Sequence, residues 1–494
     1  FEKIAELTND TSYSTAAKFF WQRVVETRSI SIGGNSVKEH FNAADNFMPM
    51  LESEQGPETC NSYNMLKLSK MLFVQNNDQK YIEFYERLLY NHILSSQHPV
   101  TGGFVYFTPI HPQHYRVYST ADQSFWCCVG TGLENHGKYG ELIYTHKKND
   151  ILVNLFIPSV LNWEEQHIKI IQQNGFPEKE SSTLIIEPTV PKRFTVFIRK
   201  PLWVKGGFAI KINGKQSKVT SSADGYAGIT RVWRKGDRID ISLPMKNYAE
   251  YLPDHSKWVS FRHGPVVLAA PTDTANMPGL FANDGRWGQN AAGPLYPLTK
   301  SPMLVDDERG PAAALHGIAG RPMEFELSGV INKSSDKNLT LIPFYEVHDT
   351  RYMLYWPVTT KDSIAQFETE MAALDENYIK LAPRTIDQVS PGEQQPEKDH
   401  MLKYDNSEAG VAGTQHWRVS SGYFSYRMRR GRGAKLIRIS YDAKTPNCDF
   451  DIYADDIKIA HIVTDGIGAA KLVNVEYPLP ASVEAGKQDV IIKF

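Results

Sequence analysis

The sequence predicts an α+β multidomain fold in which a helical part is followed by β-sandwich domains. With 494 residues, the chain is long enough for about three domains. Apolar residues recur at helical spacing up to about residue 145, whereas after Lys148 they alternate with polar residues, as in strands. A polar stretch near residue 390 precedes a last alternating segment. We therefore predict three domains, at residues 1–148, 149–385 and 386–494.

The first domain is expected to contain four helices, at residues 13–28, 60–75, 78–94 and 133–146. The first of these is expected to bury Phe19 and Phe20, together with Ala16, Val24 and Val25. About four helices cannot bury their own apolar faces well as a closed layer. We expect that they either pack on the sandwich or are joined by further helices that precede Phe1.

The second domain has short alternating runs separated by Gly, Pro and Asn, which predict a β-sandwich from about residue 150 to 270. The tetrapeptide INGK at 212–215 favours a hairpin. Residues 273–320 are rich in Gly, Pro and Ala and are expected to form a long crossing loop. Alternation then resumes and predicts further strands.

The polar stretch SPGEQQPEKDH at 390–400 is expected to be a linker, and the alternating runs after it predict a second sandwich. Within that sandwich, Trp417, Tyr423 and Phe424 have two interpretations. They either pack in the core or form an exposed aromatic surface for sugars, which makes 386–494 a candidate carbohydrate-binding domain.

The composition excludes several classes of partner. A net charge of −2 and a pI near 6.8 indicate neither nucleic acid nor an anionic membrane surface. The sequence contains no run of about 18 apolar residues, so we predict no membrane-spanning helix. No signal peptide is recognisable, so the sequence leaves the compartment open, with a bacterial periplasmic or secreted location as a hypothesis. It does not indicate an oligomeric state.

The four cysteines, at 60, 127, 128 and 448, are too few for a disulfide scaffold. Cys60 follows Thr59, a plausible helix N-cap, and Cys127 and Cys128 shortly precede a helix expected to begin near Gly132. Helix N-termini favour thiolates over thiols. Three thiolates brought together would need a cation, and Zn²⁺ bound by thiolates plus one carboxylate or histidine fits best. The alternative is that all three are buried core residues.

Acidic residues near these cysteines are candidates for acid–base chemistry. Glu58 lies two residues before Cys60 and is a candidate general acid. Three other glutamates compete for the acid or the metal role: Glu39, Glu52 and Glu54. Four histidines are possible metal ligands: His40, His111, His114 and His136.

The block from Tyr13 to Tyr144 carries several motifs in a specific order. They are the pair Gly33–Gly34 followed by Glu39 and Phe41, the tripeptide ETC at 58–60, YNHIL at 90–94, and the tandem cysteines of FWCCVGTGLENH. In this order they resemble the β-L-arabinofuranosidases of glycoside hydrolase family 127 and its sister family 146. The FWCC segment looks closer to the family 146 version.

This resemblance implies a zinc-dependent retaining glycosidase with a cysteine nucleophile. By motif position, Glu39, Cys60, Cys127 and Cys128 would hold the zinc, Cys127 would also be the nucleophile, and Glu58 would be the acid/base. Tyr106 and Trp126 would contact the substrate. Because this chain has a few extra residues between Glu39 and Glu58, the metal ligand at Glu39 has two possible substitutes, Glu52 and Glu54.

The resemblance also implies an (α/α)6 barrel followed by β-sandwiches, of which this chain would hold about the last third of the barrel. The expected function is the release of β-linked L-arabinofuranose from an oligosaccharide or polysaccharide. Two alternatives remain: a related glycosidase for another sugar, and a carbohydrate-binding or scaffold protein with a structural zinc.

Overall fold

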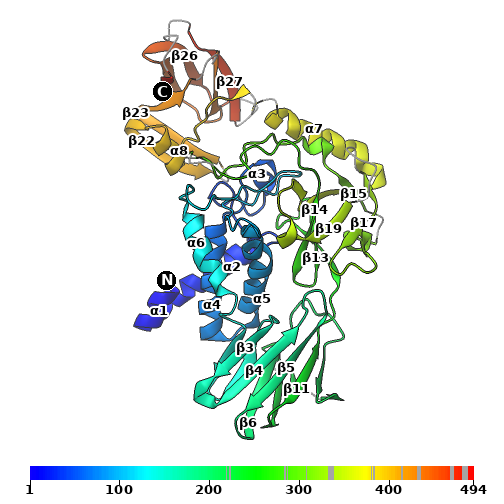
Figure 1. The fold of residues 1–494 in the computed structure, drawn as a ribbon. Helices are drawn as coiled ribbons and strands as arrows, with labels where there is room; N and C mark the ends of the chain where they lie inside the picture. The colour runs from blue at the N-terminus through cyan, green and yellow to red at the C-terminus, as the bar shows by residue number, and fades with distance from the viewer. Residues whose placement is uncertain are drawn as a thin grey trace. The chain divides into compact units, whose positions relative to one another are not determined.

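A computed structural model describes residues 1–494 except 218–219, 222–223, 283–284, 286, 307–308, 332–338, 380, 382–383, 413–414, 431–434, 468–471 and 481–487. The chain divides into two compact units, residues 1–375 and 376–494, which are described separately. The fold is mixed α+β, with helices first and many sheets after them (Figure 1). Among the described residues, no helix is long and apolar enough to span a bilayer.

The first unit begins with the helical part. Its helices are α1 (Glu2–Thr8), α2 (Thr11–Thr27), α3 (Met48–Glu52), α4 (Thr59–Asn76), α5 (Gln79–Leu88) and α6 (Cys127–Asn135). A π-helical turn, η1 (Leu89–Ile93), and the 3₁₀ turn η2 (Leu94–Ser96) extend α5, and the 3₁₀ turn η3 (His136–Lys138) follows α6. The first three predicted helices are therefore confirmed as α2, α4 and α5 with its extension.

Two details of the predicted helices are wrong. The fourth helix starts at Cys127 and ends at Asn135, because Gly137 and Gly140 weaken a continuation and Tyr144 already pairs as a strand with Val153. In α2 the buried face contains Trp21, whereas Phe19 and Phe20 are 60% and 47% exposed. Trp21 turns inward because its indole N–H donates to Ser69 Oγ on α4 at 2.8 Å.

A β-sandwich follows the helices, as predicted. One sheet has the order β1–β2–β6–β10–β9 and the other β3–β4–β5–β11–β7–β8, and side chains from both form a single apolar core. The strands are β1 (Tyr144–Lys147), β2 (Asp150–Val153), β3 (Ser159–Trp163), β4 (Ile168–Asn174), β5 (Ser181–Pro188), β6 (Lys192–Arg199), β7 (Ala209–Ile212), β8 (Lys215–Gln216), β9 (Thr220–Ser221), β10 (Tyr226–Trp233) and β11 (Asp237–Ser242). The predicted INGK hairpin joins β7 to β8.

A third, ten-stranded sheet occupies residues 247–359. Its strands are β12 (Asn247–Tyr251), β13 (Trp258–His263), β14 (Val266–Pro271), β15 (Met303–Val305), β16 (Leu315–Gly317), β17 (Phe325–Leu327), β18 (Val330–Ile331), β19 (Leu339–Pro343), β20 (Tyr352–Met353) and β21 (Trp356–Thr359). The predicted long loop is thus shorter than expected, because β15 and β16 lie within 273–320. The described residues between β14 and β15 contain only the 3₁₀ turn at Leu298–Lys300. Helix α7 (Ile364–Ile379) follows β21.

The second unit is a smaller β-rich body. Its sheets are β22–β23–β28–β25–β26 and β24–β27, and both contribute to one apolar core. The strands are β22 (Lys403–Ala412), β23 (Gln415–Arg429), β24 (Leu436–Asp442), β25 (Cys448–Ala454), β26 (Ile457–Thr464), β27 (Leu472–Pro478) and β28 (Asp489–Lys493).

The predicted linker at 390–400 is wrong, because it contains helix α8 (Gln394–Asp399), which packs on this body. Glu397 of α8 is buried and accepts two hydrogen bonds from the Arg418 guanidinium, at 2.5 and 2.6 Å, and one from the Tyr426 hydroxyl at 2.7 Å. This polar stretch is ordered because the buried Glu397 carboxylate is hydrogen-bonded by Arg418 and Tyr426.

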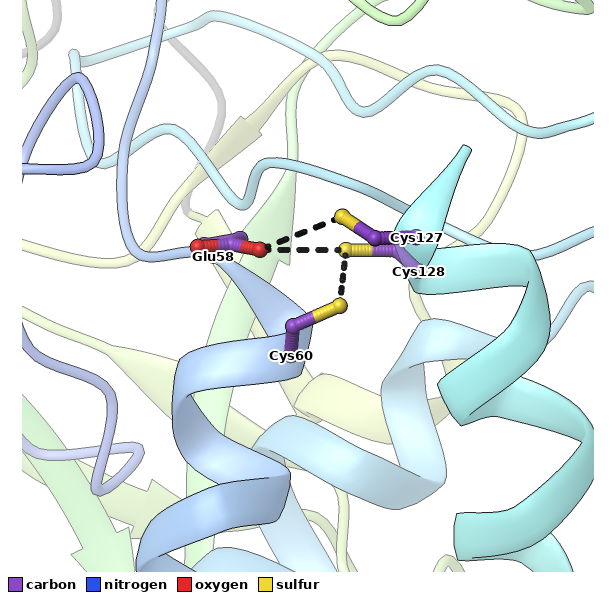
Figure 2. A group of neighbouring side chains, drawn as sticks. All are labelled: Glu58, Cys60, Cys127 and Cys128. Atoms are coloured by element: carbon purple, nitrogen blue, oxygen red, sulfur yellow. Dashed lines mark hydrogen bonds between the residues drawn. The ribbon is translucent and has the colours of Figure 1, made fainter. Parts of the chain in front are cut away.

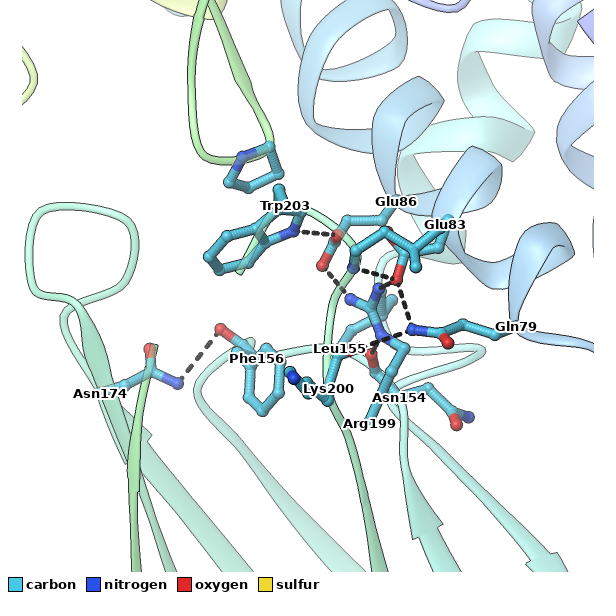
Figure 3. Close-up of polar contacts among 12 residues, drawn as sticks. Gln79, Glu83, Glu86, Asn154, Leu155, Phe156, Asn174, Arg199, Lys200 and Trp203 are labelled. Atoms are coloured by element: carbon cyan, nitrogen blue, oxygen red, sulfur yellow. Dashed lines mark hydrogen bonds and ion pairs between the residues drawn. The ribbon is translucent and has the colours of Figure 1, made fainter. Parts of the chain in front are cut away.

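In the first unit, one buried guanidinium joins the helical part to the sandwich (Figure 3). Arg199, at the end of β6, is fully buried and donates to Glu83 and Glu86 of α5, and to the Asn154 carbonyl at 2.6 Å. Glu86 also accepts a hydrogen bond from the Trp203 indole at 2.9 Å. Burial raises the pKa of Glu86 and the charge of Arg199 opposes that rise. Removal of either partner would leave a buried charge without its counterion.

We therefore expect Arg199→Met to lower the free energy of unfolding by about 3–5 kcal/mol, the usual cost of breaking one side of a buried ion pair. Arg238→Met is the matched control, because Arg238 is 53% exposed in its pair with Asp240 and should cost less than about 1 kcal/mol. Urea unfolding of both variants measures the difference, and equal losses would contradict the role given to Arg199.

The Glu397 contacts predict a pH dependence of the second unit. Burial opposes the charge, but hydrogen bonds from Arg418, from the Gly392 amide and from Tyr426 lower the pKa of Glu397 below its usual value. Its contribution to stability is therefore present above the ordinary glutamate pKa and is lost as the pH falls through the lowered one. In Glu397→Gln, thermal unfolding of this unit between pH 3 and 7 should depend less on pH than in the wild type. Glu476→Gln, at a more exposed ion pair, should leave the pH profile unchanged.

Candidate active site

Two helix N-termini meet at the three cysteines of the first unit. Helix α4 begins at Thr59, directly after Glu58, and α6 begins at Cys127. Neither N-cap residue, Glu58 or Trp126, makes a side-chain capping bond. The free N–H groups and the dipoles of both helices therefore favour negative charge at this point.

The side chains at this point form a compact group (Figure 2). One ligand atom each from Glu58, Cys60, Cys127 and Cys128 lie within 4.8 Å of one another. Cys60 Sγ is 3.1 Å from Cys128 Sγ, and Glu58 Oε1 is 3.5 Å from Cys127 Sγ and 3.7 Å from Cys128 Sγ. All three cysteines are free thiols. Three sulfur donors and one carboxylate at these distances could hold a metal ion.

The backbone fixes the Glu58 side of this group. Residues 57–59 pair with residues 106–108 as a short antiparallel bridge, in which the Thr59 amide donates to the Tyr106 carbonyl and the Thr108 amide to the Pro57 carbonyl, both at 3.0 Å. The Thr59 hydroxyl adds a bond to the Val105 carbonyl at 2.8 Å. Helix α4 therefore starts in a direction that is set by the segment that carries Tyr106.

Helix α6 approaches the same segment closely. A Cβ on Gly132 would lie 2.5 Å from the Phe104 ring, so only glycine permits this contact. Tyr63 of α4 donates to Glu134 of α6 at 3.0 Å and holds the two helices together. As a result Cys128 is fully buried, Cys60 is 8% exposed, and Cys127 at the helix start is exposed to solvent.

Charge in the group concentrates on the exposed sulfur. Contacts with the Cys128 and Cys60 thiols, and then with Tyr106 and Glu58, lower the pKa of Cys127 far below the usual thiol value. Hydrogen bonding to Cys127 raises the pKa of Cys60, and burial raises that of Cys128. Burial, the charge of Cys127 and the charge of Glu39 raise the pKa of Glu58 to about 7. These shifts favour negative charge on the exposed Cys127 sulfur and protonation of the other acidic groups, unless a cation is present.

Glu39 does not belong to the group of four and lies on its exposed side. The Tyr106 hydroxyl donates to Glu39 Oε1, and the Tyr106 oxygen is 3.6 Å from Cys127 Sγ. Glu39 and the preceding Lys38 both have positive φ, 66° and 50°, a conformation that non-glycine residues keep only when their surroundings impose it. The structure therefore connects Glu39 to Cys127 through Tyr106 and places Glu58, rather than Glu39, among the thiols.

The remaining sequence-predicted residues separate into neighbours of the site and residues outside it. Trp126 is partly buried and packs edge-on against Tyr106, with 6.1 Å between ring centroids. The group of four contains none of the other candidates, Glu52, Glu54, His40, His111, His114 and His136. His111 bonds to the carbonyls of Leu51 and Tyr296, and His136 to Tyr139 and Ser96.

Two residues of the site escaped the sequence analysis. The Thr131 hydroxyl lies 3.1 Å from Cys60 Sγ, and Asn61 donates to Asn35 Oδ1 at 2.8 Å and to Ser36 Oγ at 3.1 Å. Asn61 thus ties the loop that leads to Glu39 onto helix α4. The position of Asn61, directly after Cys60, was the one sequence feature that could have indicated it. Thr131 is four residues after Cys127 and so faces the same side of α6, a spacing visible once the helix start is known.

The helical part and the first sandwich each match a known family. The catalytic-domain model of the family 127 β-L-arabinofuranosidases matches residues 1–141, and the middle-domain model of the same family matches 150–245. Two further families, both of unknown function, match residues 248–358 and 380–494. No curated protein sequence matches the chain.

Solved structures of similar fold include two family 127 enzymes. The β-L-arabinofuranosidase Ara127N of Geobacillus stearothermophilus T6 is 18% identical, with a TM-score of 0.53, and the match covers 72% of this chain and 59% of that one. A family 127 β-arabinofuranosidase is 20% identical, with a TM-score of 0.55, and the match covers 72% and 58%. A glycoside hydrolase is 18% identical, with a TM-score of 0.50, and the match covers 71% and 63%. The match thus spans about three fifths of the length of these structures.

The helical part and the sandwich that follows it are thus matched, in this order, by two domain models of one glycoside hydrolase family. That family is glycoside hydrolase family 127, whose catalytic domain residues 1–141 resemble and whose middle domain residues 150–245 resemble.

The site predicts which cysteines matter for metal binding. Cys60→Ser, Cys127→Ser and Cys128→Ser should each weaken the binding of Zn²⁺ by orders of magnitude, because each removes one donor from a set of four. Cys448→Ser should leave binding unchanged, since Cys448 is in β25 of the other unit. Calorimetric titration of Zn²⁺ into the metal-free protein measures this, and equal effects of all four substitutions would contradict the site.

Proposed function

We propose that this protein is a retaining glycoside hydrolase that releases β-linked L-arabinofuranose from a glycan, with Cys127 as its nucleophile. The observation that carries the proposal is an exposed cysteine sulfur at a helix N-terminus, 3.6 Å from the Tyr106 hydroxyl and 3.5 Å from Glu58, with Glu39 bonded to the same hydroxyl. The resemblance to family 127 supports the substrate class, because its named members are β-L-arabinofuranosidases.

The donor set supports Zn²⁺ as the metal. Three thiolates and one carboxylate match the soft and borderline ligands that zinc prefers, in the number that a tetrahedral site requires. Glu58, Cys60, Cys127 and Cys128 would hold it. When bound, zinc would stabilise the thiolates at neutral pH and leave Cys127 anionic.

The roles of the two glutamates follow from their places. Glu58 is half-buried and lies among the thiols, and a carboxylate committed to a cation cannot also carry a proton for the leaving group. Glu39 is exposed and is joined to the nucleophile through Tyr106. We therefore propose Glu39 as the acid/base and Glu58 as the fourth ligand, the reverse of the assignment made from the sequence.

The reaction then has two displacements at the anomeric carbon. In the first, Cys127 Sγ forms a bond to this carbon while Glu39 gives its proton to the departing oxygen. In the second, Glu39 takes a proton from a water, whose oxygen replaces the sulfur. Each displacement inverts the anomeric centre, so the product retains the configuration of the substrate. Tyr106 orients Glu39 and Cys127 toward each other, and Trp126 offers an apolar face beside the sugar.

The C-terminal unit is a candidate glycan-binding part of the same enzyme. Trp417 is 39% exposed and its ring lies against Gly410 of the neighbouring strand, which supports binding of a sugar face. Phe424 instead stacks on Phe494 at 4.9 Å and serves packing, and Tyr423 lies under the Lys493 ammonium at 4.7 Å. Trp417→Ala should weaken glycan retention in affinity electrophoresis without a change in the hydrolysis of a nitrophenyl glycoside. Unchanged retention would contradict this candidate role.

A comparison of Glu39→Gln with Glu58→Gln separates the two glutamate roles. Glu39→Gln should keep its zinc and lose about 10²–10⁴-fold in kcat on an arabinofuranosyl disaccharide, with a smaller loss on the nitrophenyl glycoside, whose leaving group needs no proton. Glu58→Gln should lose zinc and both activities together. The reverse pattern would restore the sequence-based assignment. Release of α-arabinose as the first product would contradict retention.

A further inference from the structure

A histidine outside the group of four connects the segments that build it. His92 lies in the π-helical turn η1, is fully buried, and uses both ring nitrogens. Nδ1 is 2.6 Å from Ser62 Oγ, and Nε2 is 3.1 Å from Thr108 Oγ1. Burial and the charge of Arg116 lower the pKa of His92 to about 3, so the ring is neutral and has one donor and one acceptor for its two partners.

The two partners of His92 belong to the two halves of the short bridge at the site. Ser62 is in the first turn of α4, two residues after Cys60. Thr108 ends the segment that carries Tyr106, and its amide donates to the Pro57 carbonyl. Both hydroxyl side chains are fully buried, so neither can exchange the imidazole for water. The imidazole thus spans the bridge from its inner side.

The loop that leads to Glu39 rests on the same ring. A Cβ on Gly34 would lie 3.0 Å from His92 Nδ1 and 2.7 Å from Pro57 Cβ, so this glycine lets the backbone lie directly against both residues. Gly33, with a φ of 85°, packs in the same way on Leu88. The Gly–Gly pair seen in the sequence therefore lets the Glu39 loop pack against the end of α5 and against η1.

We propose that His92 is a positioning residue, which fixes the spacing between the thiol group on α4, the Tyr106 segment and the Glu39 loop. The inference rests on the proposed function for its catalytic consequence, but its structural part stands without it. The π-helical turn contributes to this role. A π-turn is wider than an α-turn, so the residues of η1, including His92, point in other directions than a continued α5 would give them.

The test removes single hydrogen bonds rather than the ring, since His92→Ala may fail to fold. Thr108→Val and Ser62→Ala each remove one partner, and Thr108→Ser keeps the hydroxyl. Asn91→Ala is the matched control from the same turn, because Asn91 is equally buried but bonds to Pro265 and Val267, away from the site. All variants are compared at a temperature at which each is fully folded.

Three readouts report on the local geometry of the site rather than on the global free energy of unfolding. Thr108→Val and Ser62→Ala should weaken Zn²⁺ binding by about tenfold or more, which is the usual effect of substituting residues that orient metal ligands. Both should also lower kcat with little change in KM. They should also lower the hydrogen-exchange protection factors of the Thr59 and Thr108 amides, which form the bridge. Thr108→Ser and Asn91→Ala should resemble the wild type in all three.

The outcomes separate the two proposals. Bridge protection in Thr108→Val and Ser62→Ala equal to that in Asn91→Ala would overturn the role of His92, whatever the activity of the protein. Loss of bridge protection in these two variants supports it. A wild type that neither binds Zn²⁺ nor cleaves arabinofuranosides would contradict the proposed function, and the exchange measurement would still decide the role of His92.

Discussion

The short backbone pairing of residues 57–59 with 106–108 is the interaction on which the site depends. It sets the starting direction of α4 and so the places of Glu58 and Cys60, and it sets Tyr106 beside them. Helix α6 adds its cysteines only because Gly132 can approach Phe104 in the same segment. A pairing of a few residues can hold this geometry because Thr59 on one side of it, and Tyr106, Phe107 and Thr108 on the other, are buried.

Buried charge is handled in two different ways in the first unit. At Arg199 the cation comes from the chain itself and is matched by two carboxylates and a carbonyl. At the cysteines, the pKa values are shifted by burial and by contacts with the group's own members and with Glu39, Tyr106 and Thr131. The first arrangement is complete and holds the helices to the sandwich. The second collects anionic ligands at two helix N-termini, which is what a cation site requires.

Periodicity predicted the elements well where one face is buried. Helices α4 and α5 and the sandwich strands followed their apolar patterns, because burial on one side imposes a strict period. The prediction failed for the inner face of α2. Phe19 and Phe20 fit a helical apolar pattern, but Trp21 is the buried residue and the two phenylalanines are exposed. It failed for the polar stretch 390–400 because the partner of Glu397, Arg418, lies 21 residues away. The cysteines were recognisable as a set, but contacts such as Thr131 to Cys60 depend on how α6 packs.

The two glutamates show what spacing can and cannot decide. Glu58 and Cys60 are two residues apart across a helix start, with Glu58 extended and Cys60 in the first turn, so their side chains converge at one N-terminus. Local geometry alone therefore brings the two potential ligands of the tripeptide ETC together. Glu39 reaches the site through a loop with three residues at positive φ, Ser36, Lys38 and Glu39, whose path no periodicity describes. A carboxylate that is presented by such a strained loop, exposed, outside the group of four and held by Tyr106, is in a suitable place for the proton exchange that we propose for it.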